Sequence, residues 1–169
     1  MNGEHTKPVE SRTEDLSLSH FSNEPYLRHI YSKKQRVAEY RSCFDKPCGL
    51  WVSVDGEHDW PSWCESESFG IGRFRHQIYL APDSNVLHLK SASDIMDFRA
   101  KWGIEKEDRF RDVYIPWEKV AEAYQGIIIA PYQWSRRMEE NWYYGWDCAS
   151  GCIWDAAAIQ CAEPIREVA

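Results

Sequence analysis

The chain lacks the features that would direct it into or across a membrane. Its 169 residues contain no apolar run of about 20 residues, the length that a membrane-spanning helix needs. No cationic segment followed by an apolar stretch opens the chain, so no secretory signal is expected. We therefore expect no membrane partner and a cytoplasmic location, in the protein's own cell or in a host cell.

Several familiar catalytic motifs are also missing. There is no P-loop, no Gly-x-Ser-x-Gly, no His-Glu-x-x-His and no Cys-x-x-Cys. The Gly-Ile-Gly at 70–72 lacks a third glycine and precedes an expected strand, so it is not a dinucleotide-binding fingerprint. Basic residues are few, because 20 Lys and Arg stand against 27 Asp and Glu, a net charge of −7. This charge disfavours non-specific nucleic-acid binding but allows a local basic pocket for a small phosphate ligand.

The six cysteines have spacings that match the usual zinc patterns poorly. Without a secretory signal, disulfides are not expected either, and reduced, mostly buried thiols are the first interpretation. A four-thiolate zinc site remains an alternative, built from Cys43, Cys48, Cys148 and Cys152.

Aromatic residues are abundant, with 9 Trp and 9 Tyr in the chain. Such a content is typical either of a tryptophan-rich core or of a cleft for a flat ligand or a partner. Residues 1–14 are polar and aperiodic, which predicts a disordered arm before one domain over 15–169. Within this domain, short strands alternate with helices, and this order favours an α+β fold.

Hydrophobic periodicity and capping residues locate the elements of this domain. The expected strands are 16–22, 46–54, a strand pair formed by 73–81 and 86–91 across a turn, 127–130, and 151–159 after a long aromatic loop. The expected helices are 22–42, 59–69 with Asp59 as its cap, 91–103 with Ser93 as its cap, and 115–126.

Four short motifs, taken in chain order, resemble the ADP-ribosyltransferase superfamily. They are "LSHFS", "GLWVS", "YQGIII" and "SGCIWDAAAI". The resemblance covers most of residues 15–160, and the chain is similar to a divergent member. It implies one domain with a split antiparallel or mixed β-sheet core and flanking helices, and it implies NAD as substrate.

The resemblance also implies roles for individual residues. His20 resembles the ribose-binding residue of the first strand. Trp51 and Ser53 stand where the family contacts NAD from the second strand. Tyr143 is expected to frame the nicotinamide together with Trp51, and Ser150 to belong to the same NAD-binding set.

The catalytic acid departs from the family pattern. The family carries a Glu near Ser150, and this chain has none there. Asp147 is the nearest acid and is the expected catalytic residue, while Asp155 is expected to cap the next turn. Breaking the nicotinamide–ribose bond builds an oxocarbenium-like cation, which a fixed carboxylate stabilises.

We therefore expect an enzyme that transfers ADP-ribose from NAD to a protein or a nucleic acid, or that hydrolyses NAD. It would act as a toxin, a defence factor or a phage effector. The alternative to an enzyme is a non-catalytic interaction or inhibitor protein on a degenerate scaffold, using the aromatic segment 142–147. Arg136 and Arg137 are either a solvated pair or contacts to phosphate or to a partner.

Overall fold

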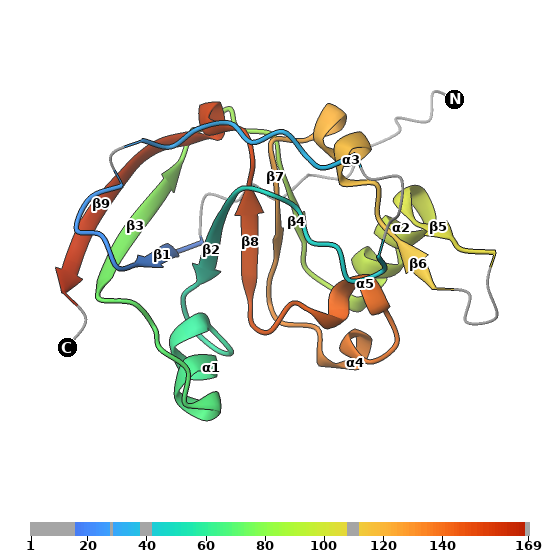
Figure 1. Cartoon of the computed structure of the whole chain (residues 1–169), viewed down its shortest axis with the longest axis horizontal. Helices are drawn as coiled ribbons and strands as arrows, with labels where there is room; N and C mark the ends of the chain where they lie inside the picture. Colours follow the sequence, from blue (N-terminus) through green and yellow to red (C-terminus); the bar gives the residue numbers. More distant parts are fainter. Residues whose placement is uncertain (1–15, 28, 38–41, 108–111, 168–169) are drawn as a thin grey trace, which may run out of the picture.

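A seven-stranded mixed sheet forms the centre of the molecule (Figure 1). The computed structural model describes residues 16–27, 29–37, 42–107 and 112–167. The strands follow the order β4-β7-β8-β2-β1-β3-β9, and only the β4–β7 pair is parallel among these neighbours. The expectation of one domain of mixed helix and strand content is confirmed. The arm expected over 1–14 lies outside the described residues.

The sheet strands are β1 Leu18–Ser22, β2 Leu50–Val54, β3 Phe74–Leu80, β4 Val86–Leu89, β7 Gly126–Ile129, β8 Ser150–Ile153 and β9 Ile159–Glu167. A small second sheet pairs β5 Ile104–Glu105 with β6 Val113–Tyr114. The helices are α1 Trp60–Glu67, α2 Ala92–Trp102, α3 Trp117–Ala123, α4 Trp134–Arg137 and α5 Asn141–Tyr144, and a 3₁₀ turn spans Ala156–Ala158. In the described residues, no helix is both long and apolar enough to cross a membrane.

The helix expected over 22–42 is wrong for the part of this segment that the structure describes. Residues 23–27 and 29–37 adopt no helical conformation. Contacts with residues outside this segment replace the local hydrogen bonds of a helix. The Lys33 N–H donates to the Trp154 carbonyl (2.7 Å), and the Gln35 side-chain amide bonds both backbone groups of Cys48 (2.7 and 2.8 Å). Tertiary pairing has overridden helix propensity.

Two further expectations need correction. The strands expected over 73–81 and 86–91 exist but do not pair with each other, because β3 pairs with β1 and β9 whereas β4 pairs with β7. The last expected strand, 151–159, is interrupted after Ile153 by the 3₁₀ turn, and β9 follows it. Asp155 caps this turn as expected, because its carboxylate accepts from the Ala157 N–H (2.9 Å).

The start of α2 is set by Ser91 and not by the expected Ser93. The Ser91 hydroxyl accepts from the Asp94 N–H (3.1 Å), and the Asp94 carboxylate accepts from the Ser91 N–H (2.9 Å). These reciprocal bonds form a capping box, which satisfies two otherwise unpaired donors at the helix start.

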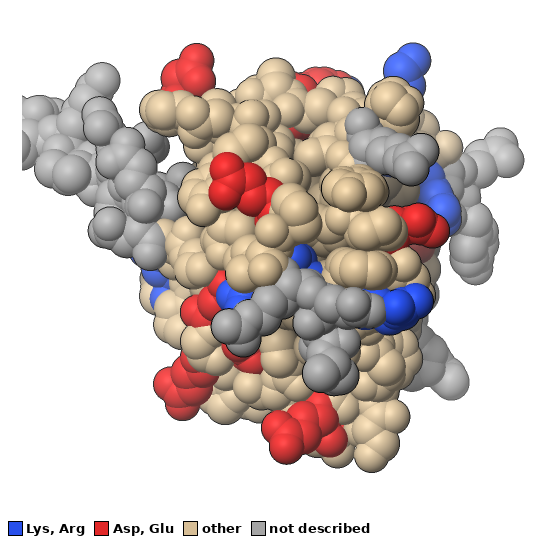
Figure 2. Space-filling view, turned by 90° about the vertical axis from the view of Figure 1, so that its left-hand side faces the viewer, with Lys and Arg blue, Asp and Glu red and all other residues tan. Residues whose placement is uncertain are grey.

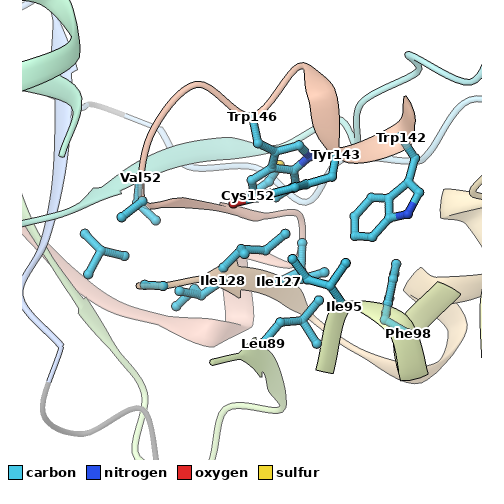
Figure 3. Close-up of a cluster of buried hydrophobic side chains, with 14 of the residues drawn as sticks. Val52, Leu89, Ile95, Phe98, Ile127, Ile128, Trp142, Tyr143, Trp146 and Cys152 are labelled. Carbon is cyan, nitrogen blue, oxygen red and sulfur yellow. The ribbon is translucent and has the colours of Figure 1, made fainter. Parts of the chain in front are cut away.

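The aromatic residues divide between the core and the surface. Trp142, Tyr143 and Trp146 are almost fully buried and pack with Ile127 and Ile128 of β7 (Figure 3). The other buried indoles belong to Trp117 and Trp154, while Trp51, Trp60, Trp63 and Trp102 are half-buried and Trp134 is exposed. The tryptophan-rich core is therefore real, but it accounts for only part of the indole content.

The sheet forks between β1 and β2, a feature that positions the candidate site. These two strands share only the register pairs Leu18↔Val54 and Ser19↔Ser53. Beyond them, β1 continues along β3 as far as Ser22↔Phe74, whereas β2 continues along β8 as far as Leu50↔Ile153. The two strands point in clearly different directions in Figure 1.

Candidate functional site

A pocket of about 470 Å³ opens where β1 and β2 diverge. This volume lies within the range of small-molecule sites. Six segments contribute to its walls: the end of β1, the segment before β2, β2 itself, the start of α1, the loop before β3 and the segment that leads into β8. The lining residues are Ser19–Asn23, Lys46, Trp51–Ser53, Trp60, Gly70–Gly72, Asp147, Cys148 and Ser150.

Five of the six residues predicted to bind NAD or to act on it line this pocket. They are His20, Trp51, Ser53, Asp147 and Ser150. They come from three regions that are far apart in the sequence. The fork brings them together, because it places the end of β1 opposite β2 and the start of β8.

The remaining predicted residue, Tyr143, lies elsewhere. It is fully buried, it does not line the pocket, and its hydroxyl accepts from the Gln133 N–H (3.0 Å). The reason is that α5 turns this ring inward against Trp142 and Tyr132 (centroid distances 5.8 and 5.6 Å). Burial also raises the pKa of the phenol far above its ordinary value. The structure therefore assigns Tyr143 to the core.

His20 links the two arms of the fork. Its Nδ1 donates to the Trp51 carbonyl (2.7 Å), which can only accept, so the neutral ring carries its proton on Nδ1. Nε2 then offers a lone pair and has no partner among the described residues. Burial lowers the pKa of His20, and nearby His76 lowers it further against the raising effect of the Trp51 carbonyl. The ring is therefore neutral near pH 7 and can accept a hydrogen bond from a ligand hydroxyl.

Three serines form a row across the closed end of the fork. The register pairs Ser19↔Ser53 and Ser53↔Ser150 align them on one face of three adjacent strands, and all three are buried. Ser19 donates to Asp55 (2.9 Å) and Ser150 donates to the Cys148 carbonyl (3.0 Å). Ser53 differs from them, because its oxygen accepts from the Trp60 N–H (2.9 Å) and its own proton remains available to a ligand.

Asp147 supplies the pocket's carboxylate. In the described part of the chain, no other Asp or Glu lines the pocket. One carboxylate oxygen lies 3.5 Å from Nη2 of Arg137, and the Asp147 side chain remains 30 % exposed. Arg137 itself lies over the Trp134 and Tyr144 rings (5.8 and 5.4 Å), which hold its guanidinium in place. Arg136 pairs with Glu139, so neither arginine is a free solvated charge.

Two indoles face the pocket. The Trp51 ring packs edge-on against Trp146 (4.9 Å, 61°), which fixes its orientation. Trp60 stacks on Trp63 (4.9 Å, 17°) at the first position of α1. Sequence reasoning missed Trp60, although Asp59 correctly predicted the helix start that places this ring just after β2.

The loop at 70–72 also lines the pocket and was missed as a site element. Gly72 has a φ of +93°, and a Cβ there would lie 3.1–3.2 Å from the backbone of Ser22. Glycine therefore allows this loop to approach the end of β1 and to close one wall of the pocket. The sequence signal for this wall is the glycine pair Gly70 and Gly72, which does not form a dinucleotide-binding motif.

The cysteines give no support to the zinc alternative. Within the described ranges, no group of three or more His, Cys, Asp or Glu is arranged to hold a metal ion. The Cys43 thiol faces Asp112 (3.6 Å) and the Cys152 thiol faces the Pro47 carbonyl (3.7 Å). Burial raises the pKa of Cys148 to about 12, which keeps this thiol protonated near neutral pH.

Comparisons with protein-family models, with curated proteins and with solved structures find no match to this chain.

Proposed function

We propose that the chain binds NAD in the fork pocket and cleaves its nicotinamide–ribose bond, as a divergent ADP-ribosyltransferase-like enzyme. The observation that carries this proposal is the convergence of His20, Trp51, Ser53, Asp147 and Ser150 on one pocket. The family resemblance assigns roles to these residues from three separate segments of the sequence.

The pocket offers a polar wall for the ribose and flat walls for a ring. His20 presents an acceptor and Ser53 a donor, and a ribose diol can satisfy both. The indoles of Trp51 and Trp60 offer aromatic faces or edges to the nicotinamide. Trp60 thus takes the role that the sequence assigned to Tyr143.

Asp147 has the chemistry that the bond cleavage requires. As the nicotinamide leaves, positive charge develops on the ribose ring, and a nearby carboxylate stabilises it. The half-buried Arg137 fixes one oxygen of Asp147, which limits reorganisation during the reaction. In this proposal the acceptor of the ADP-ribose is water, a protein or a nucleic acid.

The release of nicotinamide from NAD tests this proposal. We expect the wild-type chain to release nicotinamide and Asp147→Asn to do so roughly 10²-fold more slowly, with NAD binding retained. Glu139→Gln serves as the matched control, because this carboxylate is 60 % exposed and lies outside the pocket. Equal rates for the wild type and Asp147→Asn would remove Asp147 from the mechanism.

A non-catalytic interaction protein remains the second candidate, and the surface near the pocket favours it. Phe44, Trp134, Met138 and Tyr144 are exposed by 45 to 77 %. Aromatic residues beside an arginine are frequent hot spots of protein interfaces. Trp142 and Trp146 cannot serve this role because they are buried. A partner retained by the wild type, lost with Trp134→Ser and indifferent to NAD would favour this candidate.

The charge distribution bears on the acceptor. The side that faces left in Figure 1 carries scattered acidic and basic groups, with no continuous basic band among its described residues (Figure 2). Together with the net charge of −7, this gives an acceptor with a phosphate backbone no extended basic surface on this side of the molecule.

A further inference from the structure

We infer that Lys46 forms a phosphate-binding subsite in the fork pocket. This inference rests on the proposed function and names the part of NAD that the lysine binds, its diphosphate. Among the described residues that line the pocket, Lys46 is the sole Lys or Arg. The sequence did not single it out, because it lies before the motif "GLWVS" at the start of the strand expected over 46–54. In the structure β2 begins only at Leu50, and Lys46 lies in an irregular segment before it.

The Lys46 side chain is held in place by two contacts. Its Nζ lies over the Trp51 ring, 5.3 Å from the centroid. Its stem crosses Gly145, where an added Cβ would come within 2.7 Å of the Lys46 Cε. The missing side chain at Gly145 therefore makes room for the lysine. The cation–π contact then directs its ammonium group toward the indole that lines the pocket.

The charge of Lys46 is available to a ligand. In the described part of the chain, no carboxylate forms an ion pair with Lys46, whereas Arg136 pairs with Glu139 and Arg137 with Asp147. The rest of the lining is neutral except for Asp147. A ligand with two negative charges entering a chain of net charge −7 needs a local cation, and an ammonium group is a common phosphate partner.

The charges also imply an orientation for the ligand. Lys46 attracts the diphosphate, and Asp147 attracts the ribose carbon on which positive charge develops. Bound NAD would therefore lie with its diphosphate at Lys46 and its nicotinamide-bearing ribose at Asp147. Nicotinamide riboside, which lacks the diphosphate, should not depend on the lysine.

Calorimetric titrations of the wild type and of Lys46→Met with three probes test the inference. The probes are NAD, nicotinamide riboside and inorganic pyrophosphate. We expect Lys46→Met to weaken the binding of NAD and of pyrophosphate at least tenfold and that of nicotinamide riboside less than twofold. Lys119→Met is the matched control, because Lys119 is an exposed lysine on α3 that contacts Glu122. Gly145→Ala should weaken NAD binding in the same direction by displacing the lysine.

The outcomes separate this inference from the proposed function. If Lys46→Met binds NAD as tightly as the wild type, the subsite is wrong and the proposed function stands. The subsite is also wrong if nicotinamide riboside loses as much affinity as NAD, because the lysine then only orients Trp51. If the wild type binds pyrophosphate through Lys46 but ignores NAD, the subsite stands and the proposed function fails. If the wild type binds none of the probes, both are overturned.

Discussion

His20 donates its Nδ1 proton to the carbonyl of Trp51 across the fork in the sheet, at 2.7 Å. The bond joins two strands just beyond their last shared register pair, Ser19↔Ser53. It thereby limits how far the strands separate, and it also fixes the tautomer that leaves Nε2 free to accept. The same contact therefore shapes the pocket and sets its chemistry.

The first prediction concerns the pH dependence of stability. Burial lowers the pKa of His20 below its ordinary value of 6.5, so the unfolded chain takes up a proton there before the folded chain does. The free energy of unfolding should therefore decrease as the pH falls below 6.5, and this decrease should end below the folded pKa. His88, whose pKa burial also lowers, contributes in the same direction.

His20→Gln isolates the contribution of His20, because it removes the titrating ring and keeps a polar side chain. Urea unfolding at about pH 7.5 and about pH 5.5 should show a smaller pH effect for the variant than for the wild type. Both proteins keep His76, whose ring centroid lies 6.4 Å from that of His20 in the wild type. An identical pH effect in the two proteins would mean that His20 titrates normally.

The second prediction separates core tryptophans from surface ones. Trp142 is 1 % exposed, so Trp142→Ala should lower the free energy of unfolding by about 3–5 kcal/mol through the cavity it leaves. Trp134 is 54 % exposed, so Trp134→Ala should lower it by less than about 1 kcal/mol. Denaturant unfolding of both variants measures this difference, and equal losses would contradict the described packing.

The third prediction tests the revised start of α2. Ser91→Ala removes the side-chain half of the capping box and should cost about 0.5–2 kcal/mol of stability. Ser93→Ala lies in the first helical turn on an exposed position and should cost less than about 0.5 kcal/mol. Thermal unfolding of the two variants, measured in parallel, shows which serine caps the helix. A larger loss of stability for Ser93→Ala than for Ser91→Ala would restore Ser93 as the cap.

The fourth prediction concerns the indole that the sequence did not identify. Trp60→Ala should weaken NAD binding roughly three- to tenfold, because an aromatic ring contact contributes about 0.5–1.5 kcal/mol beyond its buried area. Trp63→Leu removes the ring stacked behind Trp60 and keeps the wall of the pocket, so it should weaken binding less. Fluorescence titration with NAD measures both, and an unchanged affinity for Trp60→Ala would exclude this wall from the site.

Local patterns predicted the individual elements but not their partners. The strand patterns around Leu18 and Val52 and the caps Asp59 and Asp155 can be recognised in short stretches of sequence. The structure has strands, a helix and a turn at these places. The pairing of β4 with β7 depends on residues some 40 positions apart, as in Leu87↔Ile127, and no short window contains it. The same holds for the segment 29–37, which is held by distant backbone groups.

The sequence could predict those site residues that belong to a recognisable strand motif. His20, Trp51 and Ser53 lie within or at the ends of β1 and β2, so a motif on these strands carries their positions. Tyr143 lies on the short helix α5, in a segment that the sequence predicts as an aromatic loop. The sequence does not show which of its aromatic rings face the core, because Trp142, Tyr143, Tyr144 and Trp146 all lie close together in it. Trp60 and Lys46 lie outside the strand motifs, at the start of α1 and before β2. Only the three-dimensional fold shows that they line the pocket.

The binding of NAD to the unaltered chain, followed by calorimetry, tests the central claim most directly. The account predicts saturable heat with one site per chain, and competition by ADP-ribose for that site. An absence of heat up to millimolar NAD, with the chain shown to be folded, would contradict the claim that the fork between β1 and β2 is a dinucleotide site.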